Sequence, residues 1–287
     1  MTESVAQFEW DSRQVIKVTV YTLLLVNFGL YILEDIEAAS HEMRNGGTLL
    51  EWMQAFATTI DESAWFILLL LFELETYVLS DEFQERPWVT RLVHGVRLVC
   101  YLFLAHSIYA FGIIYWNIAH AEAVAGVTHL CQLLGQDLSF VRNVEYTGIT
   151  AENCDGLSSA GQFFFTEPAL VVSDAEGLAL EQRLAFVDWL EVVVWLLILA
   201  TIEIMVRLQD RGITRGPLVS VIKGSKLVLY TGLWAMAAWW ASLGHLYYAW
   251  DEALWIVGFF AIESNMKEWK DEIEAGETGN PIPAQST

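Results

Sequence analysis

The sequence predicts an all-α integral membrane protein with six transmembrane helices. They form three hairpin repeats in parallel orientation, with an extracytoplasmic insert between helices III and IV. Three observations predict this class. Hydrophobic residues make up 55% of the 287 residues and the mean hydropathy is +0.39, which is more apolar than an ordinary soluble domain. Several apolar runs reach the roughly 20 residues that a bilayer core requires. Basic residues also concentrate in alternate loops.

The first hairpin covers 1–80, with helices over about 15–35 and 62–80. Its first apolar run has no charge between Lys17 and Glu34. No cleavage site interrupts this run, so we expect an uncleaved membrane anchor. The segment 48–59 between the two helices carries apolar residues on one face, which predicts a short helix lying on the membrane surface.

The second hairpin covers 91–207, with helices over about 97–119 and 185–207 and the insert at 121–183. The run 98–119 contains no acidic or basic residue. Glycine and Asp/Asn clusters in the insert predict loops around one or two short helices. The insert holds Cys131 and Cys154, which we expect to form a disulfide in an oxidising compartment, with two free thiols as the alternative.

The third hairpin covers 219–270, with helices over about 226–249 and 251–267. The uncharged run of its second helix extends only from Ala253 to Ile262, so a re-entrant or interfacial helix is the alternative to a full span. The segment 271–287 is charged and then rich in Gly, Pro and Ser, which predicts a disordered cytoplasmic tail.

The basic residues predict the orientation, because Lys and Arg concentrate in cytoplasmic loops. Six spans with both termini inside leave 12 of the 15 basic residues on the cytoplasmic side. Only Arg44, Arg142 and Arg183 then face outward. We therefore expect a multi-pass protein of the inner or plasma membrane with both termini in the cytoplasm.

The net charge of −21 excludes a nucleic-acid partner, since phosphates require a basic surface. The predicted partner is the lipid bilayer. Acidic loops indicate a solvated surface, or alternatively attraction of cations to the outer face.

An internal repeat connects the three hairpins. Each even-numbered span carries an acid, a tryptophan four residues later and a glutamate eight residues after that. The positions are Asp61/Trp65/Glu73, Glu191/Trp195/Glu203 and Asp251/Trp255/Glu263. The odd-numbered spans carry a basic residue with a tyrosine four residues later, at Lys17/Tyr21, Arg97/Tyr101 and Lys226/Tyr230.

The spacing predicts that these glutamates and tyrosines reach a similar depth. Each glutamate lies about 18 Å below its outer acid, and each tyrosine about 6 Å above its basic residue. A carboxylate in hydrocarbon needs a partner, so one interpretation is that the glutamates are clasps between helices, paired with these tyrosines or with Arg207 and Lys267. The alternative is a ring formed by Glu73, Glu203 and Glu263 that binds a cation or proton.

The ring hypothesis predicts a transporter or channel-like protein for a small cation or protons. The alternative function is a non-catalytic scaffold or accessory subunit that contacts a protein partner through the insert. A homo-oligomer is compatible with both functions. The sequence contains no zinc, phosphate-binding or triad motif, so it identifies no metal, no catalytic residue and no cofactor, and an enzyme is the less favoured class.

Overall fold

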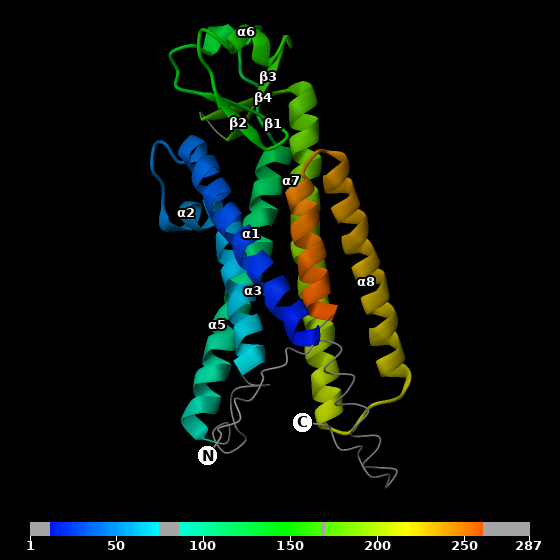
Figure 1. Cartoon of the computed structure of the whole chain (residues 1–287). Coiled ribbons are helices and arrows are strands. Elements are labelled where there is room, and N and C mark those ends of the chain that lie inside the picture. The colour runs from blue at the N-terminus through cyan, green and yellow to red at the C-terminus, as the bar shows by residue number, and fades with distance from the viewer. Residues whose placement is uncertain (1–11, 75–85, 168–169, 261–287) are drawn as a thin grey trace, which may run out of the picture. The chain divides into compact units, whose positions relative to one another are not determined.

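A computed structural model describes residues 12–74, 86–167 and 170–260. The chain divides into two compact units. One unit combines Met1–Asn27 with Val194–Thr287, and the other is Phe28–Val193. Two long helices, α1 (Ser12–Glu42) and α7 (Ala175–Asp210), contribute residues to both units (Figure 1).

Three helices in the described ranges are long and apolar enough to cross a membrane. They cover Lys17–Glu42, Pro87–Ala119 and Ala175–Gln209. A bent pair, Leu49–Ala55 with Ala57–Glu73, adds a fourth if the pair counts as one span. Large apolar side chains such as Leu25, Leu102 and Leu197 are exposed on these helices, as expected for surfaces that face lipid. These findings support membrane association.

A short helix within the segment 48–59 is confirmed, and its position on the membrane surface stays a prediction. Helix α2 (Leu49–Ala55) begins at Thr48, whose side chain and that of Glu51 form a reciprocal capping box. A bend of 75° then leads into α3 (Ala57–Glu73), which starts five residues before the predicted position. The rest of the predicted helix 62–80, from residue 75, lies outside the described residues. Helix α5 (Pro87–Ala119) starts ten residues early, because Pro87 is well suited to the first turn of a helix.

The insert contains a four-stranded sheet, so the all-α prediction is wrong for this segment. The strand order is β2-β1-β4-β3, and the strands lie together with α6 (Cys154–Leu157) near one end of α5 (Figure 1). The outer pairs are antiparallel, and the central β1/β4 pair is parallel. The strands are β1 (Ser139–Arg142), β2 (Glu145–Gly148), β3 (Phe163–Glu167) and β4 (Val171–Asp174).

Aromatic and β-branched residues explain why the insert forms strands. Short runs such as "FFFTE" and "VVSD" favour extended backbone, but each is only four or five residues long within a polar segment. Their inner faces pack with the 3-10 helix η2 (Leu130–Leu133), and the buried cluster is Leu130, Leu133, Leu138, Phe140, Phe163 and Val172. The predicted disulfide between Cys131 and Cys154 is confirmed, and it ties η2 to α6.

The remaining helices belong to the first unit. Helix α8 (Pro217–Ser242) starts and ends before the predicted 226–249. The break follows from Gly244, whose positive φ of 94° suits glycine, and a new helix covers 246–260. Residues 261–267 of the predicted sixth helix and the predicted tail 271–287 lie outside the described residues. Six spans and three repeated hairpins stay predictions.

Candidate functional site

Two adjacent carboxyl groups, Asp251 and Glu252, are buried in the first unit. Their exposed fractions are 5% and 7%. Neighbouring residues on a helix point about 100° apart, so the two side chains reach different helices. Asn27 Nδ2 of α1 donates to Asp251 Oδ1 at 2.9 Å. Trp195 Nε1 of α7 donates to Glu252 Oε2 at 3.1 Å.

The second oxygen of Glu252 has no hydrogen-bond partner among the described residues, although it is buried. The hydrogen bond that Glu252 does accept comes from a neutral donor, the indole of Trp195. Aromatic rings pack beside the pair: the Trp195 and Phe259 ring centroids lie 5.1 Å apart. The result is a buried acidic group with an oxygen available to a proton or a small cation.

A second buried carboxyl lies between α3 and α5 in the other unit. Trp65 Nε1 donates to Asp61 Oδ2 at 3.0 Å, one turn earlier in the same helix. The fully buried Ser107 of α5 interacts with the same carboxyl group. Asp61 therefore has polar neighbours on both helices of a packed pair, and its buried Oδ1 has no hydrogen-bond partner among the described residues.

The tryptophans of the predicted repeat bind different carboxyl groups. Trp65 donates to the acid of its own motif, whereas Trp195 donates to Glu252, the residue after the first acid of the third motif. Asp251, the first acid of the third motif, is almost completely buried. Sequence reasoning missed Asn27 and Glu252. Two signals could have found them: a lone asparagine inside an apolar run, and an Asp-Glu pair that occurs at both 61–62 and 251–252.

The predicted glutamates have different environments. Glu203 is half-buried, and Arg207 Nη2 lies 3.4 Å from its Oε2, as one of the predicted clasps requires. Glu73 is half-buried at the end of α3 and belongs to the other unit. Glu263 and its predicted partner Lys267 lie outside the described residues. The ring of three glutamates stays a prediction.

The six predicted partners of the glutamates share one property. All are half-buried and each takes part in at least one interaction, as expected for polar groups on membrane helices. They are Lys17, Tyr21, Arg97, Tyr101, Lys226 and Tyr230.

Asp35 has a structural role at the start of α3. Both the backbone N–H and the hydroxyl of Thr59 donate to Asp35 Oδ2, at 2.8 and 2.6 Å. Thr59 is in the first turn of α3, where backbone N–H groups have no partner within the helix. The α1 carboxyl group therefore caps α3.

The end of α1 is attached to the insert by polar contacts. His41 Nδ1 and Arg44 Nη2 each lie 2.7 Å from Ser139 Oγ, and Arg44 pairs with Asp137 at 2.9 Å. Tyr146 donates its hydroxyl to Glu42 Oε1 at 2.5 Å. Burial and then the Glu42 charge raise the pKa of Tyr146 well above its usual value, so the phenol keeps the proton that it donates.

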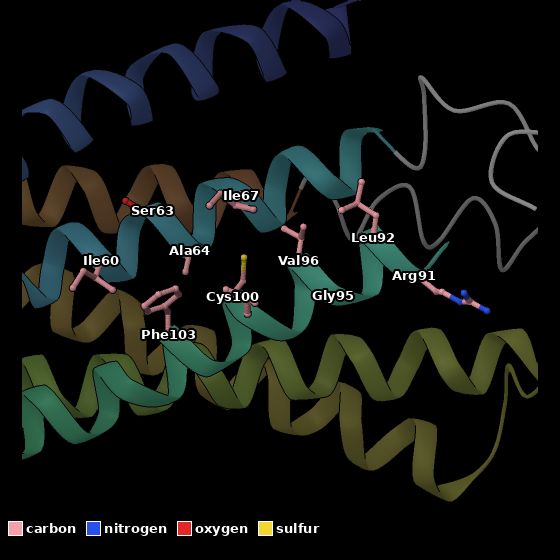
Figure 2. A pocket seen from close by; sticks show the side chains of 11 residues that line it. Ile60, Ser63, Ala64, Ile67, Arg91, Leu92, Gly95, Val96, Cys100 and Phe103 are labelled. Atoms are coloured by element: carbon pink, nitrogen blue, oxygen red, sulfur yellow. The ribbon is translucent and has the colours of Figure 1, made fainter. Parts of the chain in front are cut away.

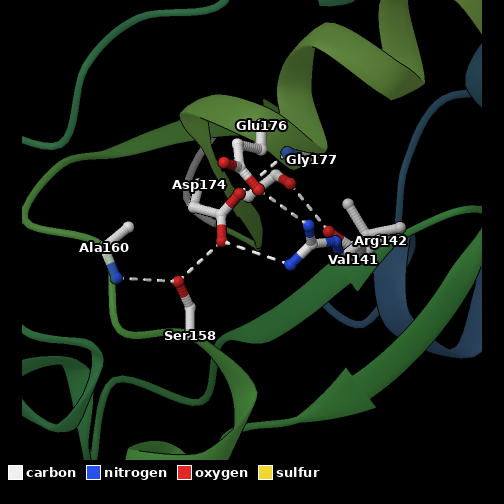
Figure 3. Close-up of polar contacts among 8 residues, drawn as sticks. Val141, Arg142, Ser158, Ala160, Asp174, Glu176 and Gly177 are labelled. Carbon is white, nitrogen blue, oxygen red and sulfur yellow. Dashed lines mark hydrogen bonds and ion pairs between the residues drawn. The ribbon is translucent and has the colours of Figure 1, made fainter.

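A further group of polar residues caps α7 (Figure 3). Gly177 N donates to Asp174 Oδ1 at 2.7 Å, and Ser158 donates to Asp174 Oδ2 at 2.6 Å. Arg142 lies 3.8 Å from the same carboxylate and 3.1 Å from Glu176. This arrangement satisfies a buried aspartate and joins β1 to the start of α7.

Three residues of the insert are of types that can bind a metal ion. The side-chain ligand atoms of His129, Cys131 and Asp155 lie within 4.8 Å of one another. Cys131 forms the disulfide, so its sulfur is not a thiolate ligand. His129 Nε2 instead faces Asp155 Oδ1 at 3.3 Å on the surface of the insert.

No family model matches this chain, and neither the curated proteins nor the solved structures compared with it include a match.

Proposed function

We propose that this chain is a multi-pass protein of the inner or plasma membrane that moves or senses protons, with a small cation as the alternative species. In this proposal both termini are cytoplasmic and the insert lies outside. The proton-binding site is the pair Asp251 and Glu252. The observation that carries the proposal is the orphaned, buried Oε1 of Glu252.

Charge and burial support this assignment. An ionised carboxylate within a membrane protein needs a positive partner, water or a proton, because desolvation costs several kcal/mol. The hydrogen bond that Glu252 accepts comes from the indole of Trp195, which is neutral. Proton uptake at Oε1 would neutralise Glu252 without any rearrangement of the tryptophan bond, which uses Oε2.

The predicted inner glutamates fit this site less well. Glu203 has a basic partner one turn away in the same helix, which compensates its charge. We therefore place the transport site at Asp251 and Glu252 and keep the ring of Glu73, Glu203 and Glu263 as the competing placement.

Proton flux into liposomes tests the proposal. The full-length protein is reconstituted with a pH-sensitive dye inside, and a potassium gradient with valinomycin supplies the voltage. We expect Glu252→Gln to abolish proton flux and Asp251→Asn to reduce it. Glu203→Gln is the matched control and should retain flux.

Two outcomes contradict the proposal. Loss of flux in Glu203→Gln, Glu73→Gln and Glu263→Gln, with normal flux in Glu252→Gln, would favour the ring. Absence of flux in the wild-type protein under proton and cation gradients, with Glu252→Gln changing only thermal stability, would favour a structural role for the pair.

The insert favours a second function, a scaffold or accessory subunit. Strand β2 is at one edge of the sheet and pairs only with β1 among the described strands. An unpaired strand edge can add a strand from a partner or from a second copy. A photo-crosslinker at Glu145 on β2 should then capture a partner in cells, whereas one at the exposed loop residue Gly161 should not.

A further inference from the structure

A half-open groove of about 540 Å³ runs between α3 and α5, within one compact unit (Figure 2). Its lining is almost entirely apolar. From α3 it includes Ile60, Ala64 and Ile67, and from α5 Val96, Val99 and Phe103. The hydroxyl of Ser63, which also lines the groove, donates to Thr59 O at 2.7 Å, so its hydrogen is already used.

A glycine leaves space in the groove. Gly95 lines its α5 side, and a Cβ at this position would meet no other atom within 4 Å. The space where a Cβ would lie is therefore open.

One end of the groove carries a positive charge. Arg91 lies at this end and Phe103 at the other (Figure 2). Arg91 is exposed and forms no ion pair within the part of the chain that the structure describes. Trp88, one turn earlier, is 57% exposed, and tryptophan is typical of the membrane–water interface. The charged end therefore fits the depth of lipid headgroups.

The length of the groove matches one leaflet. Arg91 and Phe103 are twelve residues apart on a helix, or about 18 Å. Half of the hydrocarbon core of a bilayer is about 15 Å. An acyl chain that starts at a headgroup beside Arg91 would thus extend along the whole groove.

We propose that this groove binds one acyl chain of an anionic phospholipid whose phosphate pairs with Arg91. The charge rule places Arg91 on the cytoplasmic side, where anionic lipids are enriched. A helix of a second copy fits less well, because an 18 Å length of helix about 10 Å across occupies roughly 1,400 Å³. This site is independent of any transport activity and requires only that α3 and α5 lie in the membrane.

Native mass spectrometry tests the site. The full-length protein is delipidated in detergent, equilibrated with equal amounts of phosphatidylglycerol and phosphatidylcholine, and the retained lipids are counted. We expect the wild type to retain one phosphatidylglycerol. Arg91→Gln should lower the preference for phosphatidylglycerol about fivefold, which corresponds to the roughly 1 kcal/mol that one basic residue contributes near a membrane surface.

A matched glycine pair tests the groove itself. Gly95→Leu should reduce retention of both lipids, because leucine fills the space that the chain occupies. Gly224→Leu, at an exposed glycine of α8 with equally open surroundings, should leave retention unchanged. Equal retention of the two lipids by the wild type and Arg91→Gln overturns the proposal. The proposal is also overturned if the wild type is a dimer that Gly95→Leu dissociates with no change in the retained lipid. A second copy of the chain would then be the occupant of the groove.

Discussion

Trp195 donates its indole N–H to Oε2 of Glu252 at 3.1 Å, and both side chains are buried. The two residues are 57 positions apart in the chain and lie on different helices. This bond joins α7 to the helix over 246–260, and it brings a carboxyl group of the third predicted hairpin to a tryptophan of the second. The contact has consequences for stability as well as for the proposed proton site.

Trp195→Phe should destabilise the protein by about 1–3 kcal/mol. Phenylalanine keeps an aromatic ring beside Phe259 but removes the donor, which leaves a buried carboxyl oxygen unpaired. Denaturant unfolding in detergent, followed by circular dichroism, measures the change. Trp234→Phe is the control, since Trp234 is 50% exposed and should matter little. Equal effects of the two substitutions would show that the smaller ring, and not the lost hydrogen bond, lowers the stability.

Asp35→Ala should cost about 1–2 kcal/mol, because it removes the acceptor for two donors of Thr59 at the start of α3. Helix α3 should fray first at its N-terminus, so hydrogen exchange at Thr59 should accelerate more than in α5. Glu37→Ala serves as the control, because Glu37 is exposed on the same helix. A uniform increase in exchange across both helices would argue against a local cap.

Stability should fall as the pH rises from about 4.5 to 7 through the titration of Glu167. Burial first, and then the charges of Glu42 and Glu51, raise the pKa of Glu167 from 4.5 to about 7. Between these values the folded protein binds more protons than the unfolded chain, so the free energy of unfolding decreases with pH.

Glu167→Gln should remove this pH-dependent loss of stability and make the protein more stable at pH 8. The expected gain is on the order of 1 kcal/mol, because solvent screens the charge of a half-buried group. Unfolding curves at pH 4.5, 6 and 8 measure the effect. Glu145→Gln, an exposed acid of β2, is the control. A Glu167→Gln variant with the same pH dependence as the wild type would refute the assignment.

The disulfide between Cys131 and Cys154 should contribute about 3 kcal/mol to the stability of the insert, because it closes a loop with a sequence separation of 23. The double substitution Cys131→Ser and Cys154→Ser should lower the insert's protection from protease. Denatured protein should react with one equivalent of maleimide, at Cys100, before reduction and with three after it. Three reactive thiols without reduction would contradict the bond.

The helices of the second unit could largely be predicted from the sequence. A continuous apolar run such as 98–119 and the capping residues around Thr48 act on neighbouring positions, so local reasoning finds α5 and α2. The starts and ends of the helices were predicted less accurately, because Pro87 and Gly244 set them through backbone geometry outside the apolar runs. The sheet was missed because strands of four or five residues give a weak alternation signal, and their pairing joins segments as distant as Ser139 and Val171.

By itself, the sequence determined that the chain is apolar enough for a membrane and that it has long helices, and it predicted the pairing of Cys131 with Cys154 that the structure confirms. Each follows from composition or from a small number of residues. Only the tertiary structure decided that Asn27 meets Asp251 and that Trp195 meets Glu252. The physical reason is that helical periodicity identifies a face of one helix, whereas the burial of a carboxyl group depends on which other helix covers that face.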